Sequence, residues 1–331
     1  MSHGKVLEYV KLRDLFEPAA IFVMFVANSS TLQFVLLGFS DVPQLRIYLF
    51  LIFFTMYLVA LTGNLIILSC IVYDRALHSP MYFFLSNLSL VDIGFTSSTI
   101  PTLLSTLLSS TRSLSFPSCI TQMFCFISFG NLENNLLAIM AYDRYVAICS
   151  PLRYTVRMGH SLCILLVVMS WVAACSHALL HTLMATTLHY AGIKHVNHFF
   201  CEISEVLSIS DSDTTSNYSL ILSEGAVSVG APFVCIILSY MFILLALFQL
   251  HSTQGRQKTF STCSSHLTTV CLFYGTIVSV YFRPSSGGDR TAGIGQRVAT
   301  IGYTLLTPML NPIIYGLRNK AIKRVMGKVF Q

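Results

Sequence analysis

Charge is what this chain lacks most. Only 10% of its 331 residues are charged, whereas 54% are hydrophobic; a soluble globular protein carries about 25% charged residues. So few charges cannot cover a water-facing surface of this size, which excludes a soluble enzyme, a disordered protein and a free nucleic-acid-binding protein. We therefore expect a membrane protein whose outer surface contacts lipid. The net charge of +6 is modest and indicates no nucleic-acid partner.

Seven segments are apolar over the roughly 20 residues that a helix needs to cross a bilayer. We predict spans at 47–72, 81–104, 120–142, 162–183, 218–250, 267–282 and 298–317, the sixth with a polar foot from Lys258. These segments are too long for the strands of an outer-membrane barrel and lack its alternation. The predicted fold class is an all-α membrane protein, with an N-terminal segment at 1–46, a seven-transmembrane helix bundle at 47–317 and a tail at 318–331.

The loops predict the orientation of the bundle. One side, which includes the tail, carries eleven Lys and Arg against two acids, and the other side carries nine of each. Because the cytoplasmic side of a membrane protein is the more basic one, we place the N-terminus outside the cell and the C-terminus in the cytoplasm. A glycosylation sequon at Asn28 agrees with this. A second sequon, at Asn217, lies close to the membrane, and a third, at Asn87, lies inside a span.

The tail has its own pattern. Ile322, Val325, Met326 and Val329 follow the i, i+3, i+4, i+7 spacing of one helix face, with Lys and Arg between them. This predicts an amphipathic helix on the anionic inner leaflet. A disordered tail is the alternative.

Several motifs follow one another along the spans, and together they are far more specific than any one alone. They are Gly63-Asn64, LHSPMYFFL at 77–85 with Leu88 and Asp92, MAYDRYVAIC at 140–149, Ser239-Tyr240, FSTCSSHL at 260–267 and PMLNPIIY at 308–315. On these motifs the chain resembles a vertebrate olfactory receptor of the tetrapod-type class II, a branch of the rhodopsin-like (class A) G-protein-coupled receptors. The resemblance covers residues 28–330.

The resemblance implies an odorant receptor that binds small, volatile, hydrophobic ligands within the outer half of the bundle. It implies activation of a stimulatory, olfactory-type G protein that raises cyclic AMP, a multi-pass place in the plasma membrane, and trafficking chaperones as further partners. It implies neither an enzyme nor a resident cofactor, and no cysteine spacing suggests zinc. A class A chemosensory receptor outside olfaction is the first alternative. A transporter or channel is the second, although no internal repeat or broken helix pair supports it.

Residues 1–27 lie outside the resemblance. A signal peptide is disfavoured, because the apolar run 18–27 is short. Phe25 is also too bulky for the third position before the cleavage site, if cleavage occurred before Asn28. We interpret the extension as the product of an upstream start codon or an alternative transcript, with Met24 as the other start.

Ionisable groups inside a bilayer usually face the bundle interior and have a function. Asp92 and Glu133, with Asn64 and Asn311, form an oxygen-rich set that suits Na⁺. A purely structural hydrogen-bonded network accounts for the same residues equally well. If one carboxylate is charged, we expect its neighbour to be protonated, because two close acids resist joint ionisation.

The resemblance also implies a coupling switch at the cytoplasmic end. Its residues are Asp143, Arg144, Tyr145, Tyr240, His266, Asn311, Pro312 and Tyr315. Asp143 is expected to hold the Arg144 side chain at rest, and in the active state Arg144 is expected to turn toward Tyr240. Pro312 allows the end of the seventh span to bend. His266 is expected to latch the sixth span to the third, the alternative being an ordinary packed polar residue.

Helix spacing and resemblance together give the pocket candidates, which are mostly apolar with a few polar groups, as small-molecule sites require. They are Phe126, Ile127, Gly130, Asn131, Ile221, Glu224, Gly225, Ser228, Tyr274, Ile277, Val278, Tyr281, Ile301 and Thr304. Glu224 is unusual. If ionised it would bind an amine, and if protonated an alcohol, aldehyde or ketone; we favour the alternative that it pairs with His181 or another neighbour on the fourth span. The sixth span has no central proline, so Gly275 is a candidate hinge.

Two of the ten cysteines lie on the outer side, Cys119 and Cys201. That compartment is oxidising, so we expect them to form a disulfide that holds the outer loop over the bundle. Relatives usually have two further loop cysteines; here these positions are Ala191 and Asp211. We therefore expect a looser loop than in most relatives, and eight free thiols elsewhere.

Overall fold

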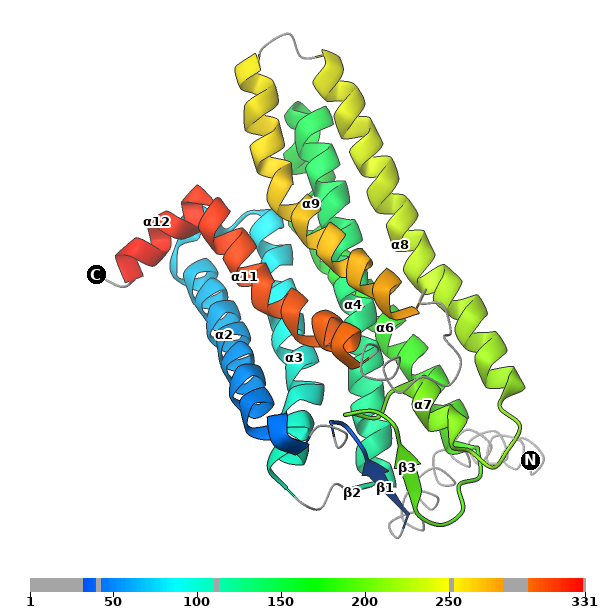
Figure 1. The fold of residues 1–331 in the computed structure, drawn as a ribbon. Coiled ribbons are helices and arrows are strands. Elements are labelled where there is room, and N and C mark those ends of the chain that lie inside the picture. The colour runs from blue at the N-terminus through cyan, green and yellow to red at the C-terminus, as the bar shows by residue number, and fades with distance from the viewer. Residues whose placement is uncertain (1–31, 40–42, 110–112, 250–252, 282–296, 330–331) are drawn as a thin grey trace, which may run out of the picture.

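The computed structural model describes residues 32–39, 43–109, 113–249, 253–281 and 297–329, which form a bundle of long helices (Figure 1). Six of the crossings are α2 (Arg46–Tyr73), α3 (Pro80–Leu108), α4 (Phe116–Cys149), α6 (His160–Thr186), α8 (Thr215–Gln249) and α9 (Thr253–Tyr281). The seventh is helical at 297–301, continues as a π-helix at Gly302–Leu306 and ends as α11 (Thr307–Arg318). The predicted seven-helix fold is confirmed, and each predicted span falls on one of these helices.

Burial identifies α4 as the central helix. In its most apolar stretch 61% of the residues are buried, against 22% in α2 and in α8, and α4 packs on α3, α6, α8 and α9. Four of the described helices, α2 with its preceding turn, α4, α6 and α8, are long and apolar enough by themselves to cross a membrane. The outer faces of α2, α6 and α8 carry many exposed Leu, Ile, Val and Phe side chains, as contact with lipid requires.

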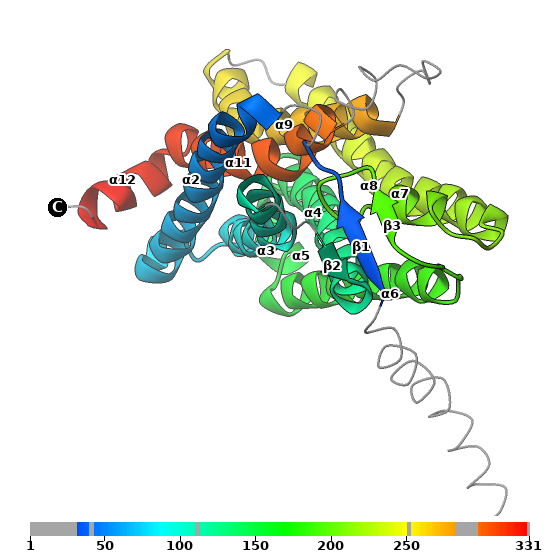
Figure 2. The ribbon, with the colours of Figure 1, turned by 60° about the horizontal axis from the view of Figure 1, so that its bottom comes forward.

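A small sheet closes one end of the bundle, which we call the sheet end (Figures 1 and 2). Its strand order is β2-β1-β3: β1 (Gln33–Leu36) pairs antiparallel with β2 (Ser113–Ser115) and parallel with β3 (Lys194–Val196). Phe34 of β1 is fully buried and packs on Phe116 and Tyr190 at 5.8 and 5.5 Å between ring centroids. This sheet was not predicted from the sequence. The N-terminal segment 1–46 therefore contributes a strand, β1, to the fold.

The opposite end carries short connections and the tail. A 3₁₀ turn at Pro151–Arg153 and α5 (Tyr154–Arg157) follow α4, and α12 (Lys320–Val329) follows α11. Ile322 and Val325 of α12 are buried while Lys323 is exposed, so the tail is an amphipathic helix. Asn28 lies outside the described residues. The Asn217 side chain is 6% exposed, which disfavours its use as a glycosylation site.

Candidate functional site

Prolines within the crossings leave backbone carbonyls without an intrahelical donor, because proline has no N–H to offer the carbonyl four residues earlier. Bulk water does not reach the bilayer core, so a side chain of a neighbouring helix is one of the groups that can replace that donor. Pro312 frees the carbonyl of Pro308, and the Asn64 Nδ2 donates to it at 3.1 Å. A Cβ atom on Gly63 would lie 2.8 Å from the Pro312 Cβ, so glycine there lets α2 come close enough for this bond.

Asn134 does the same for the fifth crossing. Pro232 lies inside α8 and frees the carbonyl of Ser228, which accepts a hydrogen bond from Asn134 Nδ2 at 2.9 Å. The Oδ1 of the same amide accepts from the Tyr274 hydroxyl at 2.5 Å. Asn134 is 1% exposed and thus joins α4 to α8 and α9 inside the bundle. Sequence reasoning missed it, although it lies four residues after Gly130 and so shares the helix face that selected Gly130.

An aromatic cluster lies on the sheet-end side of Asn134. Tyr303 of the π-helix packs on Phe95, Phe126 and Phe273, at 5.2, 6.1 and 5.8 Å between ring centroids. A Cβ atom on Gly130 would lie 2.7 Å from the Tyr303 hydroxyl, so glycine makes room for that group. The cluster joins α3, α4, α9 and the seventh crossing. Tyr303 was not a predicted site residue, because a π-helix shifts the helix face and nothing in the sequence signals it.

The other pocket candidates divide by burial. Phe126, Gly130, Ile301 and Thr304 are buried, and Ile127, Asn131, Ile221, Glu224, Gly225, Ser228, Tyr274 and Ile277 are half-buried. Val278 is 54% exposed, and its place in the pocket stays a prediction. The side chain of Tyr281 is not among those that the structure describes.

Glu224 faces α6. It lies near His177 and His181, whose rings lie 4.5 Å apart between centroids. The predicted partner was His181 or another neighbour on the fourth span. Among the described residues no hydrogen bond or ion pair joins Glu224 to either histidine, so the pairing stays a prediction.

The predicted coupling residues lie together at the end opposite the sheet. Arg144 Nη2 forms an ion pair with Asp143 Oδ2 at 2.8 Å, and the Tyr154 hydroxyl donates to Asp143 Oδ1 at 2.7 Å. His266 Nε2 lies 3.0 Å from the Leu137 carbonyl, and its Nδ1 lies 2.8 Å from the Tyr240 hydroxyl. His266 therefore joins α9 to α4 and α8. Tyr145 packs on α8 through Phe242, and Tyr315 is fully buried.

The polar network lies between these two ends. Asn311 Nδ2 donates to Asp92 Oδ2 at 3.0 Å, and Glu133 is close enough to Asp92 for their charges to interact. Among the described residues neither Glu133 oxygen has a hydrogen-bond partner, and Asp92 Oδ1, Asn64 Oδ1 and Asn311 Oδ1 are also buried without one. In the described part of the chain no three His, Cys, Asp or Glu side chains are arranged to hold a metal ion.

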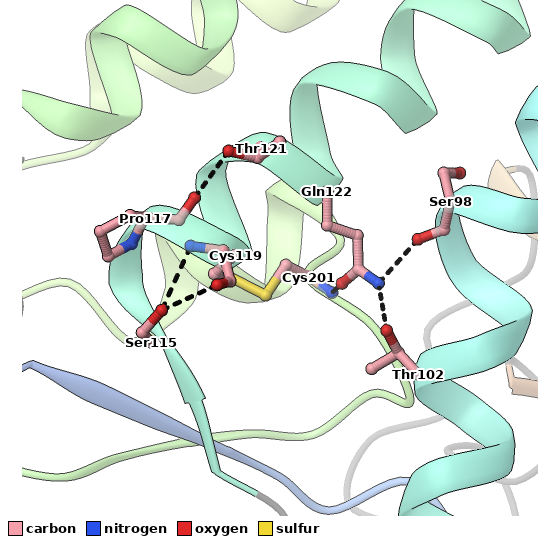
Figure 3. The surroundings of a disulfide bond; sticks show 9 residues. Ser98, Thr102, Ser115, Pro117, Cys119, Thr121, Gln122 and Cys201 are labelled. Atoms are coloured by element: carbon pink, nitrogen blue, oxygen red, sulfur yellow. Dashed lines mark hydrogen bonds between the residues drawn. A yellow bond between two sulfur atoms is a disulfide. The ribbon is translucent and has the colours of Figure 1, made fainter.

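Residues 187–214, which we call the lid, cover the sheet end. The predicted disulfide between Cys119 and Cys201 is confirmed, and the other eight cysteines are free (Figure 3). Arg297 of the seventh crossing is buried and donates to the Gly38 carbonyl and, at 2.6 Å, to Asn197 Oδ1. Burial and the nearby Arg297 lower the pKa of His198 to about 3, so this lid residue is neutral.

A polar contact joins the two lid positions that lack cysteine. Asp211 accepts from the Ala191 backbone N–H at 2.7 Å and from Lys194 Nζ at 2.6 Å. The hydrogen bonds from Lys194 and Ala191 lower the pKa of Asp211, which keeps it ionised. The predicted looseness of the lid stays a prediction. Residues 191 and 211 are nevertheless joined, by a hydrogen bond in place of a disulfide.

The fold defines a class of protein. The chain superposes on squid rhodopsin with a TM-score of 0.70 over 87% of this chain and 86% of that one, at 15% identity, so the two share a seven-helix fold. The sequence narrows the class further. A family model described as olfactory receptor matches residues 53–331. Olfactory receptor 1f45 of Rattus norvegicus is 49% identical over 91% of this chain and 96% of its own length. Olfactory receptor 1F1 of Homo sapiens is 48% identical over 91% and 97%.

The chain therefore belongs to the olfactory receptor family. It is a multi-pass membrane receptor and not an enzyme.

The Asn134 bridge gives a prediction. Replacing Asn134 with Ala leaves the Ser228 carbonyl and the Tyr274 hydroxyl without this partner, at a cost of about 1–2 kcal/mol in a membrane protein. We expect a lower thermal unfolding temperature for the receptor purified in detergent micelles, and higher basal activity, because Tyr274 no longer ties α9 to α4.

Asn135→Ala is the matched control, since it removes a neighbouring amide that makes neither contact. Equal unfolding temperatures and basal activity for the two variants would rule out the bridge.

Proposed function

We propose that the chain binds a small, volatile, mainly hydrophobic ligand among the aromatic cluster, Tyr274 and the residues of α8 at the sheet end. One observation carries the proposal: hydrogen bonds join α9 to α4 at two levels, through Tyr274 near the cluster and through His266 near Arg144. A ligand that alters the first contact shifts the helix whose other contact lies at the coupling end. The half-buried Ser228 and Tyr274 supply the few polar groups that orient such a ligand.

The partner at the opposite end is a heterotrimeric G protein of the stimulatory, olfactory type. Arg144 is held there by Asp143, and its release toward Tyr240 opens the site for the G protein. Two apolar side chains beside it, Leu152 and Val156, are 97% and 84% exposed, which suits a protein partner. In this proposal the sheet end faces outward and the C-terminus is cytoplasmic, with the basic face of α12 on anionic lipid. Trafficking chaperones are further proposed partners.

A cyclic-AMP reporter screen against a chemically varied odorant panel tests this function. Cells carry the receptor with an epitope tag before residue 32, and antibody staining of intact cells both normalises expression and tests the orientation. We expect at least one odorant to raise cyclic AMP in the native receptor. Arg144→Ala is expected to abolish that response at equal surface staining. An Arg144→Ala response equal to the native one would overturn the coupling assignment.

We also propose that Na⁺ binds near Asp92 and Glu133. The support is the set of unpaired, buried oxygens, since a hard cation prefers oxygen ligands. When bound, the ion would supply a positive charge beside the carboxylates, and Asn311 orients Asp92. The structural hydrogen-bonded network remains the alternative.

Sodium substitution distinguishes the two. In isolated membranes, we expect basal G-protein activation to be lower in NaCl than in choline chloride at equal ionic strength, because the ion stabilises the resting state. In the Asp92→Asn variant this salt difference should disappear. Equal salt dependence in the native and variant receptors would leave only the structural network.

Glu224 is proposed as the polar contact for an amine or a hydrogen-bonding ligand. It is half-buried on α8, and its charge is near His177 and His181. We expect Glu224→Gln to weaken responses to aliphatic amines roughly tenfold in concentration, with little change for hydrocarbons, whereas Ser223→Ala should change neither. A uniform loss of surface staining in Glu224→Gln would indicate a structural role instead.

A further inference from the structure

Gln122 is a buried residue that sequence reasoning passed over. Its side chain lies one turn after Cys119 on α4 and is 8% exposed. The Nε2 donates to the Ser98 carbonyl and to Thr102 Oγ1, both at 2.9 Å, and both partners belong to α3. The Oε1 accepts from the backbone N–H of Cys201 at 2.9 Å. One amide therefore joins α4, α3 and the lid (Figure 3).

The α3 partners lie beside a proline. Pro101 is inside α3, where it removes the donor for the Ser97 carbonyl and distorts the helix. Gln122 reaches the adjacent carbonyl, that of Ser98. Because both amide hydrogens and the amide oxygen of Gln122 are in use, this buried group is well satisfied, and any movement of the lid away from α3 would break at least one bond.

Cys201 is consequently attached to α4 at two points. The disulfide links its side chain to Cys119, and the Gln122 amide holds its backbone. A disulfide alone limits distance but leaves rotation about its bonds, whereas a second attachment fixes the direction of the backbone. That direction matters for the preceding residue, Phe200, because its ring packs on Phe126 of the aromatic cluster at 4.6 Å between centroids.

We propose that Gln122 is a positioning residue that sets the orientation of the lid, and with it the place of Phe200 over the pocket, according to the position of α3. The proposal rests on the proposed function only in treating the aromatic cluster as the ligand site. The lid attachment itself is independent of any ligand or G protein. A shift of α3 is transmitted to the lid through this one amide.

Thiol labelling on intact cells tests the attachment without an odorant. Exposed thiols are first blocked with N-ethylmaleimide, the disulfide is reduced with tris(2-carboxyethyl)phosphine, and a membrane-impermeant polyethylene-glycol maleimide then labels Cys119 and Cys201. Both sulfurs are fully buried, so labelling requires the lid to open. Variants are Gln122→Leu, Thr102→Val and the double variant. Thr121→Val is the matched control, since exposed Thr121 bonds only to Pro117 of its own helix.

We expect labelling to be roughly thirtyfold faster in Gln122→Leu and roughly threefold faster in Thr102→Val, as the loss of three and of one hydrogen bond implies. The double variant should match Gln122→Leu, and Thr121→Val should match the native receptor. A native rate in Gln122→Leu would overturn the attachment, and a native rate in Thr102→Val would overturn its dependence on α3. If Gln122→Leu does not reach the surface, Thr102→Val alone decides. Because no odorant response is measured, this result is separate from success or failure of the ligand screen.

Discussion

A carbonyl that proline deprives of its helical donor favours a new donor, and inside a bilayer a side chain of a neighbouring helix can supply one. This constraint fixes how the helices of this receptor meet. Asn64 serves the carbonyl freed by Pro312, and Asn134 serves the one freed by Pro232. Each bond crosses from one helix to the next, so each proline creates a place where two helices must stay in register. Gln122 makes a similar contact beside Pro101.

The same contacts connect the two ends of the molecule. Asn134 holds the carbonyl of Ser228 in α8 and also Tyr274 of α9, next to the aromatic cluster. About two turns before Tyr274 in α9, His266 contacts the Leu137 carbonyl and the Tyr240 hydroxyl beside the Arg144–Asp143 pair. Asn134 thus has two roles. Its amide satisfies the Ser228 carbonyl, and it also holds Tyr274 on α9, the helix that reaches both the ligand end and the coupling end.

Much of this was predictable because it is local. Long apolar runs mark the spans, and motifs such as Gly63-Asn64 and Asp143-Arg144 identified the family before any contact was known. Tyr303 and the β1 strand were not predictable in this way. Tyr303 reaches Gly130 only because a π-helix turns it inward, and β1 exists only because two distant segments pair with it. Asn134 was predictable only in part. Its helix face follows from the sequence, but the carbonyl it bonds to is freed by Pro232 on another helix.

A double-mutant cycle at Asn134 and Pro232 tests the central claim most directly. The thermal unfolding temperature is measured for the native receptor, Asn134→Ala, Pro232→Ala and the double variant. If Asn134 serves the carbonyl that Pro232 frees, the loss caused by Asn134→Ala shrinks in the Pro232→Ala background, because residue 232 then donates its own N–H to Ser228. Fully additive losses would contradict the account, since Asn134 would then matter for reasons unconnected with the proline.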